Sequence, residues 1–418
     1  MKNILRYSGL FLCLAAMLSC CGSSKKSAAQ VPAELADSSP VLSFTKDGQE
    51  VVAPEAEPSG ERSADRMDFA AEFLRKAALS EGLKDNLVIS PLSAGYALSL
   101  LLEGSTGKTR EELLAVLGGS FEDIVPYTDE KTTVTSASSV WLKSGMTVLD
   151  SYGKAISEKF SAQVYTRDFS SKGTVKEINS WCNDHTAGRI PSIVSELPEE
   201  TVMLLLNALY FKAPWIKPFD KNATSKGTFH AVGGNQNDVS FMSRSARIPY
   251  YKGDSFGAVS LDYDKRYSML VVLPDEGKGI SGVVSSLDAG TLRNILGGIS
   301  PRQVELELPR FTIETSLSLN STLRDMGINA AFNGGFGRMT TAPVAVSEVN
   351  QKCFIKVNEE GAEAAAVTSV SMKLTSVARP DPPVLFIVDR PFIFAIYDRE
   401  TGDIYFEGCI VKIEDKAD

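Results

Sequence analysis

The chain has 418 residues, of which 43% are hydrophobic, and its formal net charge is −9 at pH 7. This length allows a large hydrophobic core and even two or three domains, although the sequence contains no internal repeat. The acidic balance, with no basic run or aromatic platform, argues against a nucleic-acid partner, because phosphates require a basic surface.

The first 19 residues have the pattern of a signal peptide. Lys2 and Arg6 precede an apolar run over residues 7–18, which is too short to span a bilayer. Residues 17–20 read Met-Leu-Ser-Cys, similar to a bacterial lipoprotein cleavage box, so we expect a lipid on Cys20. The alternative is an ordinary secretory signal with a chance cysteine. We therefore expect an exported outer-membrane lipoprotein, held at the membrane by its lipid and either periplasmic or surface-exposed.

Residues 20–63 are predicted to be a flexible tether. They carry four prolines among many Ser, Ala and Glu residues, a composition that buries little apolar surface. The six cysteines do not predict a disulfide framework, because Cys20 and Cys21 would lie at the new N-terminus and the later ones are isolated. With no Cys-x-x-Cys pair and only two histidines, we expect no metal site, and we expect no cofactor.

Helix signals dominate the chain after residue 64. Small and apolar residues recur at helical spacing from Met67 to Ala78. Ser90 and Pro91 form an N-cap and a proline at the first helical position, opening a helix that ends at Gly104. Residues 109–112 read Thr-Arg-Glu-Glu, a capping box that predicts the start of the next helix.

Strand-like runs dominate the rest of the chain. They are predicted over residues 203–211, 269–273, 304–313, 353–357, 384–388, 392–397 and 404–411. Helices followed by many irregularly spaced strands predict an α+β fold rather than an alternating βαβ fold.

One motif suggests catalysis without the context that catalysis needs. Residues 253–257 read Gly-Asp-Ser-Phe-Gly and fit the nucleophile elbow of esterases, which requires a strand before it and a histidine after it. Here strand-like residues follow the motif, and both His185 and His230 precede it. We therefore predict a hairpin turn, and a protein that is not an enzyme.

The most informative segment is residues 359–374. From Ala362, every second residue up to Leu374 is small or apolar, and the other register is mostly polar, as in a half-buried strand. The run ends at Ser-Val-Ala-Arg-Pro-Asp-Pro-Pro (376–383), which cannot lie inside a sheet. The pattern indicates a surface loop that carries the sequence of a strand. The alternative is an exposed helix over residues 359–367, which are rich in Ala and Glu.

This segment resembles the hinge of the serpin family, and the hinge residues are Glu359, Glu360, Gly361, Ala362, Glu363, Ala364, Ala365 and Ala366. Further segments resemble serpin landmarks in family order: 86–93, 207–215, 308–311, 323–328 and 389–394. The resemblance covers roughly residues 64–414. It implies a single serpin domain over 64–418, with helices packed around three β-sheets and an exposed C-terminal reactive loop at about 359–383.

The resemblance also implies roles for residues around the main sheet. Trp215 and Arg310 would lie at the top of the sheet, where Arg310 would pair with Glu359; the alternative is two independent surface charges. A polar cluster between the middle strands would contain Ser90, Ser93, Asn207 and Gln351. The family usually has histidine at the position of Gln351, which can also donate and accept hydrogen bonds.

The function implied is that of a suicide inhibitor of proteases, whose cleaved loop enters the main sheet as a new strand. Counting from the hinge places the cleaved bond between Thr375 and Ser376, with Lys373 and Arg379 as alternatives. The expected partners are elastase-like, subtilisin-like or trypsin-like proteases, together with cysteine proteases, and we expect a monomer. The alternative function is a non-inhibitory serpin that acts as a binding or structural surface lipoprotein.

Overall fold

The structure of the chain is a computed structural model that describes residues 43–44, 50–51, 59–118, 121–122, 126–362 and 382–414. The chain divides into two compact units, Met1–Ala56 and Glu57–Asp418. In the first unit the described residues are the antiparallel strands β1 (Ser43–Phe44) and β2 (Glu50–Val51). The second unit holds all the other described elements.

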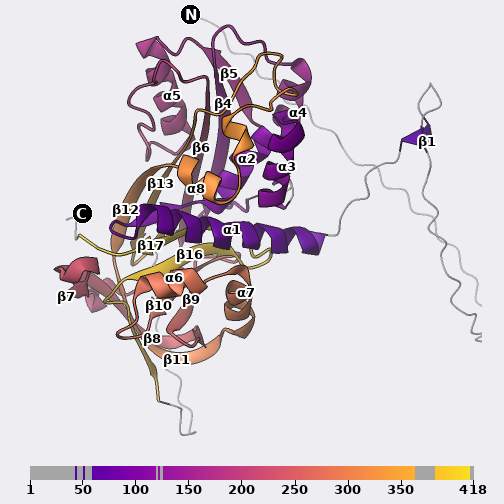
Figure 1. Cartoon of the computed structure of the whole chain (residues 1–418). Coiled ribbons are helices and arrows are strands. Elements are labelled where there is room, and N and C mark those ends of the chain that lie inside the picture. The colour runs from indigo at the N-terminus through magenta and orange to yellow at the C-terminus, as the bar shows by residue number, and fades with distance from the viewer. Residues whose placement is uncertain are drawn as a thin grey trace, which may run out of the picture. The chain divides into compact units, whose positions relative to one another are not determined.

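Eight α-helices are described in the second unit, in two groups with the first helix between them (Figure 1). They are α1 Ser59–Glu81, α2 Pro91–Gly104, α3 Gly107–Leu117, α4 Asp150–Phe160, α5 Lys172–His185, α6 Ile280–Ser286, α7 Ala289–Gly298 and α8 Asn320–Asp325.

The first three helices test the predicted helix signals. The small and apolar residues of α1 that recur from Met67 to Ala78 are buried, and α1 begins at Ser59, inside the segment predicted to be tether. Helix α2 has the predicted cap, since Ser90 Oγ accepts the Ser93 N–H at 3.2 Å. The predicted capping box of the next helix is wrong. Helix α3 begins before it, at Gly107, and Thr109 instead donates to the carbonyl of Gly334.

A six-stranded sheet forms the core of one half of this unit, with the strand order β12-β13-β14-β6-β4-β5. Helix α2 contacts β4 and β6 of this sheet and also β17 of the other sheet, so it is buried along most of its length. Helix α5 also contacts β4 and β6. The strands are β4 Thr133–Lys143, β5 Gln163–Arg167, β6 Met203–Pro214, β12 Phe311–Ser318, β13 Glu348–Asn358 and β14 Gly361–Ala362.

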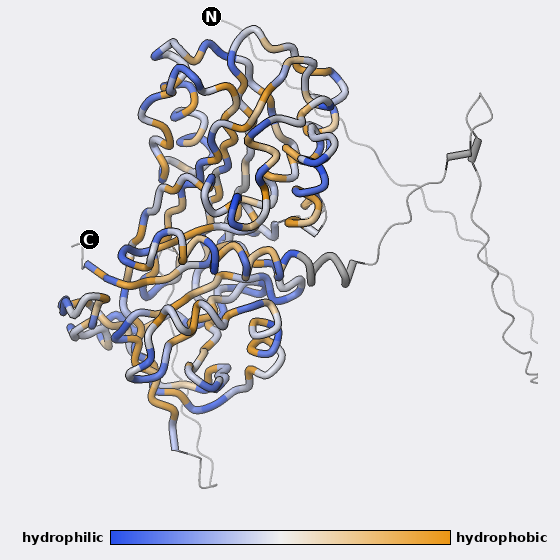
Figure 2. The backbone as a smooth tube through the Cα atoms, in the orientation of Figure 1, coloured by the Kyte–Doolittle hydropathy of each residue, from blue (hydrophilic) through white to orange (hydrophobic). Residues whose placement is uncertain are grey.

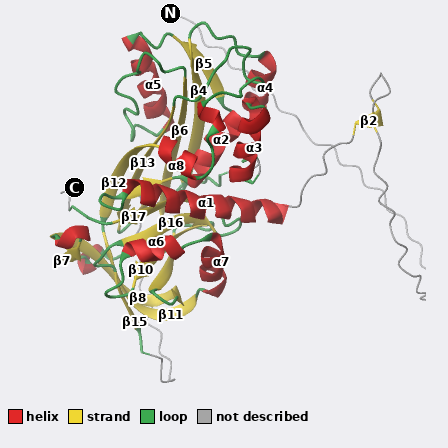
Figure 3. Cartoon of the chain, viewed as in Figure 1, coloured by secondary structure: helices red, strands yellow, loops and turns green. Residues whose placement is uncertain are grey.

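A nine-stranded sheet forms the core of the other half, and helices α6 and α7 lie beside it (Figure 3). Its main strand order is β15-β11-β8-β9-β10-β16-β17-β3, and β7 pairs with β8. The strands are β3 Leu87–Ile89, β7 Ser225–His230, β8 Gln236–Lys252, β9 Phe256–Asp262, β10 Tyr267–Pro274, β11 Ser300–Pro309, β15 Val384–Ile387, β16 Phe392–Asp398 and β17 Ile404–Ile410.

The implied α+β architecture is confirmed, and the sheets differ from expectation in one respect. Strand β8 is long enough to pair with β11 over most of its length and with β9 at its end. This shared strand joins what would be two sheets into one, so the described part of the second unit has two sheets rather than three. Figure 2 shows hydrophobic stretches gathered inside each half, with many hydrophilic residues on the outside.

The strand predicted over residues 304–313 is in fact two strands in different sheets. Strand β11 ends at Pro309 and β12 begins at Phe311, so Arg310 lies at the junction between them. The apolar pattern continues through the junction because Leu308 and Phe311 are both buried. The break places the Arg310 side chain at one end of β13, which pairs with β12.

Candidate functional site

A tight turn at the end of β13 returns the chain into the six-stranded sheet. Val357 pairs with Ala362 and Asn358 with Gly361, leaving Glu359 and Glu360 as the connection. Asn358 Oδ1 accepts the N–H groups of Glu360 at 3.0 Å and of Gly361 at 3.2 Å. Asparagine commonly supports turns in this way. This role was not predicted from the sequence, although an Asn three residues before a Gly could have indicated it.

Gly361 is required by the backbone of this turn. Its φ is +141°, in the region that favours glycine, and a Cβ atom there would lie 2.3 Å from the carbonyl oxygen of Ala213. The neighbouring strand β6 therefore approaches the hinge as closely as two backbones allow. A side chain at this position would push the hinge out of the sheet.

Strand β14 is bonded on both sides, which corrects one expectation. Gly361 and Ala362 pair with β13 on one side and with Pro214 and Ala213 of β6 on the other. The reactive loop was expected to be exposed from Glu359, yet Glu359 and Ala362 are each only 2% exposed. The first hinge residues already lie inside the sheet because the tight turn directs them between the two strands.

The buried Glu359 carboxylate is held by partners from two other segments. Arg310 Nε and Nη2 lie 2.7 and 2.5 Å from Glu359 Oε1, which confirms the implied pair. Thr224 Oγ1 also donates to Oε1, at 2.5 Å. Thr224 was missed because nothing in its local sequence indicates a distant carboxylate. Together these contacts fix the turn against the second sheet, where β11 ends.

Trp215 covers the other side of the turn. Its indole Nε1 donates to the carbonyl oxygen of Asn358 at 2.9 Å, and its backbone N–H donates to that of Glu360 at 2.9 Å. Its ring stacks on Tyr263 with the centroids 3.9 Å apart. The position implied for Trp215 at the top of the sheet is therefore the one the structure gives it.

Below the hinge, β13 and β6 separate and then meet again. Residues 348–351 of β13 pair directly, in parallel, with residues 204–207 of β6. We call this directly paired segment the seam. Between the seam and β14, the described residues 352–356 of β13 pair only with β12, and residues 208–212 of β6 pair only with β4. The inner edges of both strands are thus unpaired over this interval, which we call the slot.

The polar residues at the seam form two small groups rather than one cluster. Gln351 exchanges two hydrogen bonds with the backbone of Ser90, each 2.9 Å long. Asn207 instead donates to Ser138 Oγ at 2.6 Å, and its Oδ1 has no hydrogen-bond partner among the described residues. Gln351 and Asn207 are paired in register without a side-chain bond between them, because the amide of Gln351 is already used by Ser90. Ser138 was not among the residues predicted for this cluster.

The Gly-x-Ser-x-Gly motif and the described cysteines are placed by the structure outside the hinge. The Gly-x-Ser-x-Gly segment is the predicted hairpin turn, with the Gly253 N–H bonded to the Phe256 carbonyl between β8 and β9. Cys182, Cys353 and Cys409 are free and buried, and burial raises the pKa of Cys182 to about 12. In the described part of the chain, no group of His, Cys, Asp and Glu could hold a metal ion.

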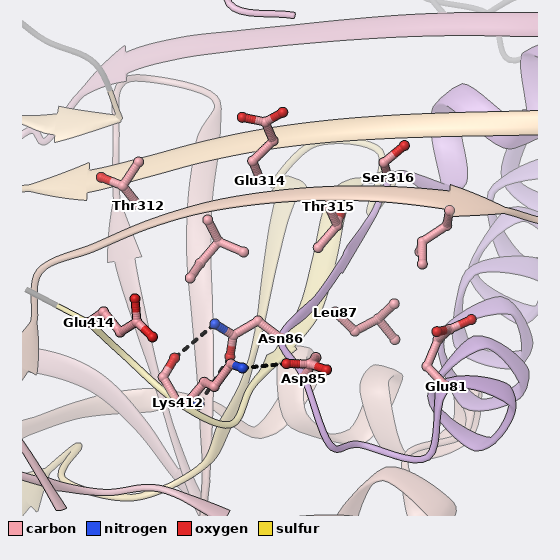
Figure 4. Close-up of a pocket in the computed structure, with 12 residues that line it drawn as sticks. Glu81, Asp85, Asn86, Leu87, Thr312, Glu314, Thr315, Ser316, Lys412 and Glu414 are labelled. Atoms are coloured by element: carbon pink, nitrogen blue, oxygen red, sulfur yellow. Dashed lines mark hydrogen bonds and ion pairs between the residues drawn. The ribbon is translucent and has the colours of Figure 1, made fainter. Parts of the chain in front are cut away.

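A pocket of about 510 Å³ lies along β12, one of the two edge strands of the six-stranded sheet (Figure 4). One wall is the 312–317 stretch of that strand, and another is tied together by Asn86, whose Nδ2 donates to the Lys412 carbonyl oxygen at 2.8 Å. Lys412 also forms an ion pair with Asp85. The pocket contains none of the hinge residues, so it is separate from the candidate site.

Several predicted positions lie outside the described residues. These are the lipidation site Cys20, the hinge residues Glu363, Ala364, Ala365 and Ala366, and the cleavage positions Lys373, Thr375, Ser376 and Arg379. No helix in the ranges given above is both long and apolar enough to cross a membrane.

Comparisons with known proteins agree with this architecture. A family model described as "Serpin (serine protease inhibitor)" matches residues 64–413. An uncharacterised serpin-like protein of Thermococcus kodakarensis is 35% identical, over 80% of this chain and 82% of its own length. A serine protease inhibitor of Cyanea capillata is 34% identical, over 79% and 93%.

Among solved structures, the thermophilic serpin tengpin in its native state superposes with a TM-score of 0.79. It is 28% identical to this chain, and the superposition covers 86% of this chain and 96% of tengpin. The chain therefore belongs to the serpin family, many of whose members are protease inhibitors and which is not a family of enzymes.

Proposed function

We propose that this serpin inhibits endopeptidases by inserting its cleaved reactive loop into the slot between β13 and β6. The observation that carries the proposal is β14, which is already paired on both sides at the top of the slot. In this mechanism the protease nucleophile attacks the carbonyl carbon of Thr375 and releases the amino group of Ser376, which takes up a proton. The acyl bond to the protease remains while the loop enters the sheet.

The register of β14 indicates where each further loop residue would lie. Continuing the antiparallel pairing places Ala364 between Phe211 and Ile355, and Ala366 between Leu209 and Cys353. All four neighbours are buried, and three of them, Phe211, Ile355 and Leu209, are bulky, so small side chains fit best between them. The alanines of the hinge have the required size.

The same register supports the proposal at two polar positions. Thr368 would lie between Asn207 and Gln351, where its hydroxyl could donate to the unpartnered Asn207 Oδ1. On the outer face, Glu363 would lie between Lys212 and Lys356. The direct seam between β13 and β6 must open before Thr368 can enter. Each new backbone hydrogen bond of the inserted strand then stabilises the inserted state by about 1 kcal/mol net.

The proposed targets are elastase-like, subtilisin-like or trypsin-like serine proteases, together with cysteine proteases, cleaved after Thr375 or, as alternatives, after Lys373 or Arg379. The test is to mix the protein with one enzyme of each class. Covalent complexes that survive SDS should form, and cleavage of the loop should raise the melting temperature sharply.

The hinge offers a matched pair of variants for this test. Ala362→Arg should be cleaved without forming a complex, because a charged side chain cannot enter the buried position between Val357 and Ala213. Ala362→Ser should still inhibit. Clean cleavage of the wild type by every enzyme, with no covalent species and no gain in melting temperature, would favour the non-inhibitory alternative, a binding or structural surface lipoprotein.

We also propose that the protein is exported, lipidated on Cys20 and held at the outer membrane as a monomer. The support is the signal-like segment and the tether, whose length would separate the serpin domain from the membrane. Mass spectrometry of the membrane fraction should find the lipid on Cys20, and a Cys20→Ser variant should leave that fraction.

A further inference from the structure

The strand that follows the reactive loop exposes two large hydrophobic side chains. In β15, Leu385 is 71% exposed and Ile387 is 37% exposed, while Phe386 between them is buried. Strand β15 forms one edge of the nine-stranded sheet, so these two exposed side chains lie at that edge. Exposed apolar residues that gather in one place often mark an interaction surface.

An acidic column stands directly beside these two residues. In the parallel pairing of β15 with β11, Leu385 lies opposite Glu305 and Ile387 opposite Glu307, about 4.8 Å away in the hydrogen-bonding direction. Glu305 accepts a hydrogen bond from Ser245 Oγ at 2.7 Å. Within the residues that the structure describes, neither glutamate forms an ion pair, and the side chain of Glu307 forms no hydrogen bond.

We propose that these four residues, Leu385, Ile387, Glu305 and Glu307, form a docking surface for the target protease outside the reactive loop. The proposal rests on the proposed function. The surface fits a protease that presents Lys or Arg side chains next to apolar ones beside its active-site cleft. Both contacts would be made before cleavage, so the surface would raise the rate of encounter.

The length of the loop keeps an attacking protease within reach of this surface. Residues 376 and 385 are nine positions apart, so a fully extended chain between them spans at most about 30 Å. A protease domain of some 200 residues is about 40 Å across. An enzyme bound at the cleavage site is therefore wider than the segment that separates it from β15, so its flank can reach the sheet edge.

A second copy of this chain is a poorer occupant. A symmetric dimer through the same surface would place Glu305 and Glu307 of one copy near those of the other. Like charges across an interface oppose association. A basic protease surface would instead complement the column.

The test compares rates of inhibition with the stoichiometry of inhibition. The variants are Glu305→Gln/Glu307→Gln and Leu385→Ser, with matched controls at other exposed positions, Glu111→Gln on α3 and Leu79→Ser on α1. For proteases with a basic flank, the association rate constant at 50 mM salt should fall about tenfold in both variants and remain unchanged in both controls. The double glutamine variant should also lose most of the dependence of this rate on salt.

The two proposals fail in different ways in this experiment. Complexes that form at an unchanged rate in both variants would overturn the docking surface and leave the proposed function standing. Absence of complexes in the wild type would overturn the proposed function, and the docking surface is then tested by binding of a protease whose nucleophile is replaced by alanine. Equal affinity of wild type and variants for that protease would overturn it, and so would a wild-type dimer that Leu385→Ser dissociates.

Discussion

Within the described ranges, two glutamates are buried almost completely, and they differ in what surrounds them. Glu359, in the hinge, lies against Arg310 and accepts a hydrogen bond from Thr224. Glu407, in β17, lies in the sheet between Ile89 and Ala395, and its Oε1 has no hydrogen-bond partner among the described residues. Burial raises the pKa of the Glu407 carboxyl well above its ordinary value of 4.5, because the charged form loses its hydration there.

The difference shows that burial alone does not determine what a carboxyl group contributes to stability. A buried polar group without a hydrogen-bond partner costs about 1–3 kcal/mol, whereas a partnered one can fix a segment in place. Glu359 therefore fixes the hinge turn in the uncleaved protein, whereas Glu407 lowers the stability of the uncleaved protein. The predictions below test the two residues separately.

The largest effect is expected from Arg310→Ala, which leaves Glu359 buried with Thr224 as its side-chain partner. Removing one member of a buried ion pair is strongly destabilising, and because Arg310 is 31% exposed we expect the low end of the range, a loss of about 3 kcal/mol. Urea titration of the uncleaved protein measures it. The double variant Arg310→Ala/Glu359→Gln should recover part of the loss, and a double variant as unstable as the single one would contradict the assigned pair.

The opposite sign is expected at Glu407. Replacing it with methionine, an unbranched apolar side chain of similar length, should raise the free energy of unfolding by about 1–3 kcal/mol. The same urea titration measures it. A destabilised Glu407→Met protein would mean that the carboxyl group has a partner that the structure does not show.

The pH dependence of stability should separate Glu407 from the other acids. Above the unfolded pKa of about 4.5, the unfolded chain releases the Glu407 proton while the native protein keeps it. Stability should therefore fall as pH rises from about 4.5 toward the raised native pKa, by at most about 1.4 kcal/mol per pH unit from this residue. Glu407→Gln should remove this part of the slope. Identical pH profiles for the wild type and Glu407→Gln would refute the assignment.

The smallest effect is expected from Trp215→Phe in the hinge. The phenyl ring can keep the contact with Tyr263 but cannot donate to the Asn358 carbonyl, so we expect a loss of about 1 kcal/mol. Hydrogen exchange at the Ala362 amide should become faster in this variant. Unchanged exchange would show that the turn is held by Asn358 and Glu359 without the indole.

The sequence predicted the elements that local patterns control. The apolar face of α1, the Ser90 cap of α2 and the hairpin at Gly253 each depend on residues close together in the chain. The pair of Glu359 and Arg310 could be named only through the family resemblance, because 49 positions separate the two residues. The structure shows the distances between the Arg310 guanidinium and the Glu359 carboxylate.

Contacts between distant segments account for what the sequence did not predict. The alternating pattern from Ala362 describes a strand equally well inside or outside the sheet, so it could not show that β14 is already paired. Thr109 fits a capping box locally, but the carbonyl of Gly334 takes its hydroxyl. Likewise, Asn207 bonds Ser138 on the neighbouring strand rather than Gln351, a choice decided by packing across β4 and β6.

The double pairing of Gly361 and Ala362 has a kinetic consequence for the proposed mechanism. A new strand ordinarily has to bring its ends together and lose chain entropy before its first bonds form. Here that nucleus exists before any protease arrives, since both flanks of β14 are already bonded. After the cut, the loop would elongate from a fixed starting point, and the opening of the paired segment between β13 and β6 would remain as the later barrier.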